Sequence, residues 1–141
     1  MTIFLLFALL APWCQASGVL PSASCTPGGV ATADLRVICH TATTTRRHVT
    51  PATRAAVMQG YGVPRADWYL YELDHLVSLE LGGDNTVANL WPEPWSDARR
   101  KDQVENALHR RVCSGAMTIE AAQARIARDW TTALETAAGG T

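Results

Sequence analysis

Lysine is almost absent from this sequence of 141 residues, since Lys101 is its only lysine. The formal net charge is −1, so the chain as a whole has no excess of positive charge that would draw it to nucleic acid. The arginines are nevertheless clustered, with adjacent pairs at positions 46–47, 99–100 and 110–111. These counts exclude a generally basic protein and leave room for one local basic patch.

The hydrophobic run at the N-terminus is short. Residues 1–16 contain no charged side chain, and their apolar run covers only positions 3–10. That is too short to span a bilayer, but it suits the hydrophobic part of a secretory signal, with Cys14-Gln15-Ala16 as a small-residue cleavage site. We therefore predict a signal peptide over 1–16 and an exported protein, periplasmic or extracellular, with no membrane contact after cleavage. The alternative is an apolar N-terminal strand or helix.

The sequence has no Cys-x-x-Cys pair, which argues against a structural zinc knuckle. One of its four cysteines, Cys14, lies in the predicted signal, so that cleavage would leave Cys25, Cys39 and Cys113. An odd number implies one disulfide and a free thiol, or an intermolecular bond. A Cys25–Cys39 bond would close a short loop, and a Cys39–Cys113 bond would join the two ends of the domain. The sequence does not choose between them.

The apolar pattern and the turn residues predict a small α+β domain over 34–136, which is long enough for one core. An arm rich in Pro, Gly, Ser and Ala precedes it at 17–33, and a frayed tail follows at 137–141. We predict short strands at 34–41 and 87–91, a strand-like segment at 68–81, and helices at about 51–59, 96–112 and from 118 onward. The last two helices carry the apolar stripes Val104, Leu108, Val112 and Ile119, Ala122, Ile126, Trp130, Leu134.

Residue types that carry chemistry gather around one acid–imidazole pair. Asp74 and His75 are adjacent near the predicted hairpin. The helix that follows carries a polar stripe spaced four residues apart, which consists of Asp97, Lys101, Glu105 and His109. Asp74 and Asp97 could approach each other where the hairpin meets this helix. Two carboxylates completed by water would suit a hard cation such as Mg²⁺ or Mn²⁺.

Several segments with this spacing resemble the HNH endonucleases of the His-Me finger (ββα-metal) superfamily. They are Glu72-Leu73-Asp74-His75, Leu79-Glu80-Leu81-Gly82-Gly83, Asn89-Leu90-Trp91-Pro92-Glu93-Pro94 and Lys101-Asp102. The similarity to a small exported branch continues through Glu105, His109, Val112-Cys113-Ser114-Gly115, the helix over 121–130, and Cys25-Thr26-Pro27-Gly28 upstream. It covers most of the mature chain, and it implies a ββα-metal core flanked by an N-terminal strand and helix and by a C-terminal helix.

The resemblance also implies an activity, namely a hydrolase that cleaves phosphodiester bonds in DNA or RNA, with DNA favoured, and that depends on one Mg²⁺ or Mn²⁺. His75 matches the general base that activates water. Asn89 matches the residue that orients this base and pins the hairpin. Asp74 matches the first metal ligand. The third position of the family motif, usually His or Asn, falls on Asp97, which would be the second ligand.

Further residues would assist this reaction. Lys101, one turn beyond Asp97, would contact phosphate or the developing charge, and Arg99 and Arg100 are the nearest further candidates for phosphate binding. Phosphate contacts position a nucleic acid without specifying its sequence, so we expect weak base preference. Glu72 and Glu105 would support the metal ligands.

Each candidate also has a structural interpretation. Asp97 could be only the first-turn acid that a helix favours, and Lys101 could be a surface ion-pair partner of Asp97 or Glu105. We expect His109 to be structural, and the tryptophans to be core and interface anchors. Two other functions stay open. One is a nucleic-acid- or metal-binding module without turnover, and the other is an exported interaction domain stabilised by its disulfide.

Overall fold

A computed structural model of the chain describes residues 14–135. Most of the predicted signal and the predicted tail lie outside these residues. The described part forms the small α+β fold that the sequence predicts. Its helices are α1 (Leu35–His40), α2 (Pro51–Gly60), α3 (Trp95–Cys113) and α4 (Ile119–Arg128), its strands are β1 (Tyr71–His75) and β2 (Leu90–Pro94), and single-turn or short 3₁₀ helices lie at Thr43–Thr45, Arg65–Leu70, Leu79–Leu81 and Val87–Asn89.

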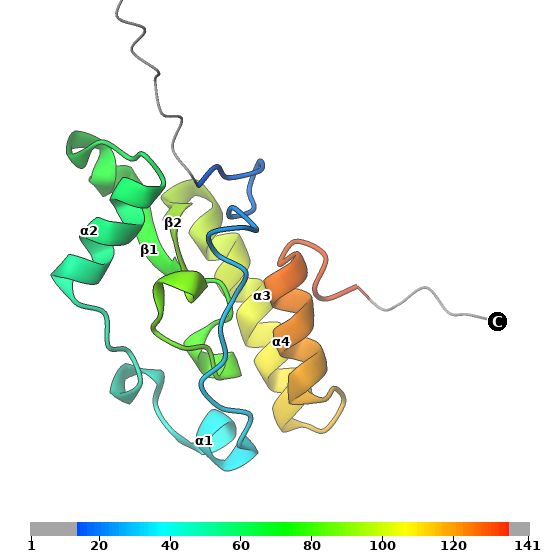
Figure 1. The fold of residues 1–141 in the computed structure, drawn as a ribbon. Helices are drawn as coiled ribbons and strands as arrows, with labels where there is room; N and C mark the ends of the chain where they lie inside the picture. The colour runs from blue at the N-terminus through cyan, green and yellow to red at the C-terminus, as the bar shows by residue number, and fades with distance from the viewer. Residues whose placement is uncertain (1–13, 136–141) are drawn as a thin grey trace, which may run out of the picture.

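The two strands lie between helices on either side (Figure 1). α2 covers one side of the hairpin, and α3 and α4 lie side by side on the other. The extended segment before α1 crosses the front of the molecule and runs past the loop of the hairpin. The predicted arm is therefore part of the packed structure, and it contacts that loop directly, since the Ala31 amide donates to the Gly82 carbonyl at 2.8 Å.

β1 and β2 pair antiparallel, with Asp74 opposite Trp91 and His75 opposite Leu90. A long loop over 76–89 joins them and returns across its own start at Gly83. A Cβ atom there would lie 1.8 Å from the Val77 carbonyl oxygen, so only glycine permits this close approach. The closed loop holds the end of β1 in place, and His75 is the last residue of that strand.

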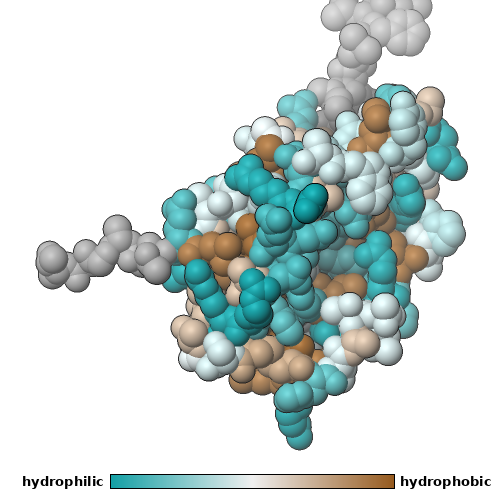
Figure 2. Space-filling view, turned by 180° about the vertical axis from the view of Figure 1, so that it is seen from behind, coloured by the Kyte–Doolittle hydropathy of each residue, from teal (hydrophilic) through white to brown (hydrophobic). Residues whose placement is uncertain are grey.

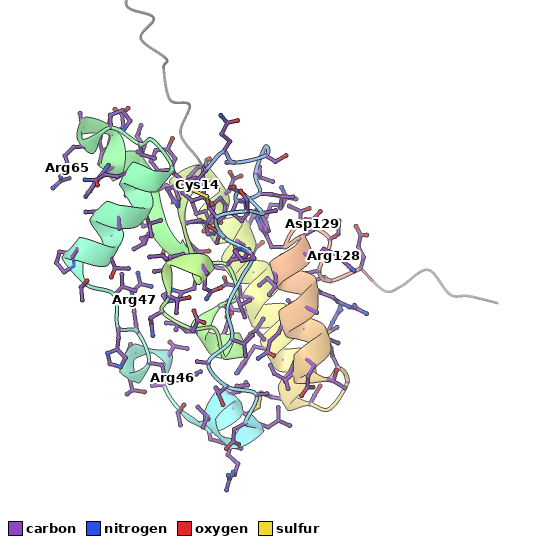
Figure 3. All side chains as sticks on the ribbon, viewed as in Figure 1. Cys14, Arg46, Arg47, Arg65, Arg128 and Asp129 are labelled. Carbon is purple, nitrogen blue, oxygen red and sulfur yellow. A yellow bond between two sulfur atoms is a disulfide. The ribbon has the colours of Figure 1, made fainter. Side chains whose placement is uncertain are left out.

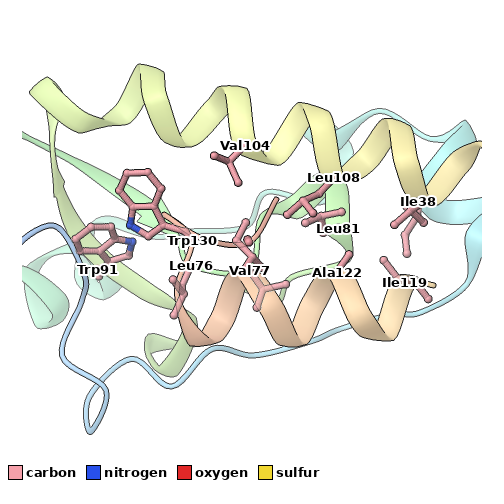
Figure 4. Close-up of a cluster of buried hydrophobic side chains, with 13 residues drawn as sticks. Ile38, Leu76, Val77, Leu81, Trp91, Val104, Leu108, Ile119, Ala122 and Trp130 are labelled. Atoms are coloured by element: carbon pink, nitrogen blue, oxygen red, sulfur yellow. The ribbon is translucent and has the colours of Figure 1, made fainter. Parts of the chain in front are cut away.

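The main core lies between α3 and α4 and beneath the hairpin loop (Figure 4). It contains both apolar stripes that the sequence predicts, Val104, Leu108 and Val112 from α3 and Ile119, Ala122 and Ile126 from α4. Trp91 and Trp130 are buried here as expected. A second cluster packs α2 on the hairpin and consists of Val57, Met58, Trp68, Leu73 and Leu90. Each face of the hairpin is therefore anchored by its own core.

Three predicted elements differ from the structure. The alternation of Leu35, Val37 and Cys39 indicated a strand, but these residues form α1, because the Asp34 side chain caps a helix by accepting from the Arg36 amide at 2.9 Å. The segment at 68–81 is a strand only from Tyr71 to His75, and the second strand lies at Leu90–Pro94 rather than 87–91. The helices predicted near 51–59, 96–112 and from 118 are confirmed.

Two disulfides are present. Cys39 bonds to Cys113 over a sequence separation of 74, which is one of the two pairings left open by the sequence. Cys14 bonds to Cys25, so the described residues have no free cysteine. The predicted odd thiol is therefore absent from the described residues. The cleavage after Ala16 stays a prediction, and it would separate Cys14 from the rest of the chain.

The surface offers no broad hydrophobic area on the face shown in Figure 2. Hydrophilic residues form a band down the middle of this face, and hydrophobic residues lie in smaller separate areas. Among the described residues, no helix has the length and apolar character needed to cross a membrane. The two disulfides are compatible with an exported protein.

Candidate active site

His75 is buried, with 3% of its surface exposed, and both ring nitrogens have partners. Its Nε2 lies 3.0 Å from Oδ1 of Asn85. The orientation of that amide is fixed independently, because its Nδ2 donates to the Arg46 carbonyl at 2.9 Å and its Oδ1 accepts from the His48 amide at 3.0 Å. The oxygen therefore faces the imidazole, and Nε2 carries the proton that is donated to it.

The other ring nitrogen keeps its lone pair. A guanidinium nitrogen of Arg47 lies 3.3 Å from Nδ1, and its second terminal nitrogen donates to the Leu73 carbonyl at 3.1 Å. Burial lowers the pKa of His75, the Asn85 hydrogen bond opposes that change, and the positive charge of Arg47 adds to it. The imidazole is therefore neutral at pH 7, with Nδ1 as its basic atom.

Asn89 fixes the loop that follows His75. The side chain is fully buried and makes four hydrogen bonds. Oδ1 accepts from the amides of Gly29 (3.1 Å) and Val77 (2.9 Å), and Nδ2 donates to the carbonyls of Val77 and Asp84 at 2.9 Å each. The amide thus ties the N-terminal segment and both ends of the loop together. This is the position that the predicted hairpin-pinning role requires.

Lys101 does not lie where the sequence placed it. Its side chain is fully buried, whereas a phosphate contact requires an accessible ammonium group. Nζ lies 2.8 Å from Oδ2 of Asp74, donates to the His75 carbonyl at 3.0 Å, and contacts Oε1 of Glu105. These three oxygens use all three of its protons. The alternative prediction, an ion pair of Lys101 with Asp97 or Glu105 at the surface, is closer to the structure. The ion pair includes Glu105, but it is buried, and its other partner is Asp74 rather than Asp97.

One ammonium group, that of Lys101, is shared by two carboxyl groups, those of Asp74 and Glu105. Burial alone would lower the pKa of Lys101, but the carboxylates of Asp74 and Glu105 outweigh it, so the pKa is raised. Burial raises the pKa of Glu105, and the Lys101 ammonium opposes this rise. Asp74 is the carboxylate that keeps the ammonium paired, and the indole of Trp91 donates to the same Oδ2 at 3.1 Å. The free oxygen of Asp74, Oδ1, makes no bond to either group.

A cavity of about 270 Å³ opens beside His75. We call it the acidic cavity, and it is lined by Glu72, Asp74, Glu80, Asp102 and Glu105 together with Arg47 and His75. Burial raises the pKa of Glu72, Glu80 and Asp102, and the charge of Asp74 adds to the rise in Glu72 and Asp102. Negative charge is therefore crowded here, and a bound cation would relieve it.

Glu93 is a further buried acid next to this group. It is 1% exposed, and Oε1 has no hydrogen-bond partner within residues 14–135. Burial, and then the charge of Asp74, raise the pKa of Glu93 to about 9. The side chain therefore keeps its proton to a higher pH than an ordinary glutamate does.

The structure separates three other predicted residues from His75. Asp97 is half-buried in the first turn of α3 and does not line the acidic cavity, whereas Asp102 does. The guanidinium of Arg100 lies 5.0 Å from the ring centre of Trp130, on the α4 side of the helix. Arg99 is exposed and lies two residues before Lys101, about 200° around the helix. Neither arginine faces His75 in this structure.

A different group could hold a metal. Ligand atoms of Cys39, His109 and Cys113 lie within 4.8 Å of one another, which no other three His, Cys, Asp or Glu residues of the described chain achieve. The two sulfurs are bonded to each other here, so they would become ligands only after reduction. His109 Nε2 also lies 2.9 Å from the Ile38 carbonyl, in agreement with its expected structural role.

Sequence reasoning missed several residues of the site. Asp102 directly follows Lys101 in the quoted motif, so its position could have been noticed. Arg47 belongs to one of the arginine pairs, but it lies 28 residues before His75 in the sequence. Asn85 lies in the loop over 76–89 that joins the two strands. No local pattern predicts that these two side chains flank the imidazole.

Comparison with known proteins gave no match: no family model, no curated protein and no solved structure matches this chain.

Proposed function

We propose that this protein is a nuclease that hydrolyses phosphodiester bonds, with His75 as the general base. The observation that carries the proposal is the state of His75. It is a neutral imidazole whose Nε2 proton is held by Asn85, and His75 lines a cavity rich in acids. A base with a fixed tautomer and a pKa below its usual value can accept a proton from water at neutral pH. The resemblance to HNH endonucleases supports the same role.

The acids beside His75 are donors of the kind that one divalent cation takes. Carboxylates are the ligands that Mg²⁺ and Mn²⁺ prefer, and Asp74 and Asp102 line one cavity in which burial and crowding raise the pKa of Asp102. Asp102 therefore replaces Asp97 as the proposed partner of Asp74. When bound, the ion would polarise a phosphate oxygen and offset the charge that develops there.

The remaining residues position the base and the acids. Asn89 holds the loop that follows the base, and Lys101 joins the His75 carbonyl to the Asp74 carboxylate. Arg47 occupies the place next to Nδ1 where an attacking water would stand. A phosphate that attracted this guanidinium would uncover Nδ1 and would deliver the reacting group to it. Glu72 and Glu105 line the cavity and act through their charge.

The proposed substrate is nucleic acid, with DNA favoured over RNA, and the proposed location is outside the cytoplasm. A second candidate is a module of the same fold that binds without turnover. One observation favours it: Oδ2 of Asp74 is already neutralised by Lys101, which reduces the charge available to a metal ion. The two candidates differ in cleavage and can be separated directly.

The decisive experiment is nicking of supercoiled plasmid by oxidised protein that retains Cys14. It is run with Mg²⁺, with Mn²⁺ and with EDTA, beside His75→Ala and the control His40→Ala, whose imidazole is exposed on α1. We expect metal-dependent nicking that falls by roughly 10²–10⁴ in His75→Ala, the usual size of general-base catalysis, and that is unchanged in the control.

Other outcomes would redirect the assignment. Wild-type activity in a folded His75→Ala protein would contradict the role of the base. If plasmid survives in both metals, a structured RNA is the next substrate. Binding of nucleic acid without cleavage of either one would favour the module without turnover.

A further inference from the structure

A second and larger cavity adjoins the acidic one along β1. It has a volume of about 620 Å³ and lies between α2, the 3₁₀ turns at Arg65–Leu70 and the start of the hairpin. We call it the basic cavity and define it by Arg47, Arg54, Arg65, Trp68, Tyr71 and Trp95. We infer that it binds an unpaired strand of nucleic acid next to the bond that is cleaved, an inference that rests on the proposed function.

The first observation is charge. Three arginines and one acid, Glu72, line this cavity, although the whole chain has a net charge of −1. The guanidinium groups of Arg54 and Arg65 lie 5.8 and 4.3 Å from the ring centre of Trp68, so the same indole holds both. Thr50 and Pro51, at the positive end of α2, also line the space. The lining therefore suits a string of phosphates.

The second observation is an exposed aromatic ring. Trp95 is 56% exposed, while Trp68, Trp91 and Trp130 are buried. It is the first residue of α3 and directly follows β2, so two regular elements fix its backbone. An exposed indole on the wall of a basic cavity is a platform on which a nucleobase can stack. In the described chain, no arginine covers this ring as Arg54 and Arg65 cover Trp68.

The third observation is continuity with the proposed active site. Arg47 and Glu72 line both cavities, and Arg47 also reaches Nδ1 of His75. Figure 3 shows Arg47 and Arg65 on the α2 side of the molecule, away from Arg128 beside α4. A nucleic-acid strand with a nucleobase stacked on Trp95 would therefore place a neighbouring phosphate at Arg47, beside His75.

These features favour an unpaired strand over a duplex. Stacking on an indole requires a base whose face is free, and the faces of bases in a duplex are covered by their neighbours. Base–aromatic stacking tolerates any sequence because every base offers a π-face. The basic cavity would thus prefer single-stranded over double-stranded nucleic acid without preferring a sequence.

The test is binding measured apart from cleavage. A labelled single-stranded oligodeoxynucleotide and its duplex are titrated by fluorescence anisotropy in EDTA, with the full oxidised chain. The variants are Trp95→Ala, Trp95→Phe and Arg54→Glu. Their controls are Tyr69→Ala, because Tyr69 is 74% exposed but lies outside the cavity, and Arg128→Ala.

We expect the single strand to bind more tightly than the duplex. Trp95→Ala should weaken this binding roughly five-fold or more, which corresponds to the loss of one stacked base, and Trp95→Phe should restore most of it. Arg54→Glu should weaken binding and reduce its salt dependence by about 0.7 in the logarithmic slope for each phosphate that the arginine no longer neutralises. Both controls should match the wild-type chain.

The inference is overturned if the duplex binds as tightly as the single strand, or if Trp95→Ala binds like the wild-type chain. Cleavage separates it from the proposed function. If the protein nicks plasmid but Trp95→Ala binds the single strand like the wild-type chain, only this inference is contradicted. Binding of the single strand that depends on Trp95, without cleavage of any substrate, would contradict the proposed function and support the binding site.

Discussion

The acidic and basic cavities lie side by side along β1, but their side chains are held in different ways. In the acidic cavity, His75 and Glu105 are buried, and Lys101, which bonds to Glu105 and to the His75 carbonyl, is sealed from solvent. In the basic cavity, Arg54, Arg65 and Trp95 are exposed and stand on regular elements. A buried charge network resists change, while exposed side chains can be exchanged at little cost. Substitutions in the acidic cavity should therefore alter stability and chemistry, and those of Arg54, Arg65 or Trp95 should alter binding alone.

The largest effect is expected from Lys101→Met. This change leaves Asp74 and Glu105 without the ammonium that pairs them, and loss of one partner of a buried pair typically costs about 3–5 kcal/mol. Urea unfolding at pH 7 measures the change, and Arg99→Met, on the exposed side of the same helix, is the control. The loss should shrink at low pH as the carboxylates become protonated. Equal stability of Lys101→Met and wild type at pH 7 would show that the network needs no ammonium.

Arg47→Ala should have an intermediate effect, because Arg47 belongs to both cavities. It should weaken strand binding about ten-fold, as expected when a charged hydrogen bond to phosphate is removed. Its charge also helps to hold the pKa of His75 down. The acid limb of the pH–rate profile should therefore move to higher pH, since the base must be deprotonated to act. If Arg47→Ala changes binding but leaves the acid limb in place, Arg47 does not influence the pKa of His75.

The smallest effect is expected from Glu93→Gln, which keeps the shape of a neutral acid. The pKa of Glu93 rises from its ordinary 4.5 to about 9 on folding, because burial first and then the charges of Asp74, Glu105 and Glu72 raise it, while the Lys101 ammonium opposes the rise. Between pH 4.5 and about 9, Glu93 is protonated in the folded chain but ionised in the unfolded chain. The free energy of unfolding therefore falls as the pH rises through this range. The amide has no proton to lose, so the melting temperature of the variant should exceed that of wild type by a few degrees at pH 6, where the linkage amounts to about 2 kcal/mol, and should nearly match it at pH 4.5. Parallel curves for the two proteins would mean that Glu93 titrates normally.

The sequence predicted the parts of the molecule that depend on local pattern. The stripes of α3 and α4 recur every three or four residues and lie in the core as predicted. The motif also singled out Asp74, His75 and Asn89, whose roles stay predictions. α1 was misread, since six residues with alternating Leu35, Val37 and Cys39 fit either a strand or a helix, and the Asp34 cap decides between them. Short segments carry too little periodicity to distinguish the two.

What the sequence could not provide is the partner of each site residue. Lys101 was expected at the surface because an ammonium group is rarely buried, and only the fold shows that three oxygens surround it. Arg47 and Asn85 lie in loops that the fold brings next to His75, and no sequence motif predicts this. Arg99 and Arg100 were chosen because they are close to the motif in sequence, but helical rotation directs them elsewhere.

The bond between Cys14 and Cys25 has a practical consequence for anyone who prepares this protein. A recombinant chain that begins at Ser17 lacks the partner of Cys25 and presents an unpaired thiol, which can join two molecules through an intermolecular bridge. Such a covalent dimer would carry two copies of the site and could be mistaken for a natural assembly. Intact mass before and after treatment with a reducing agent distinguishes that artefact from the monomer, and a chain that starts upstream of Cys14 avoids it.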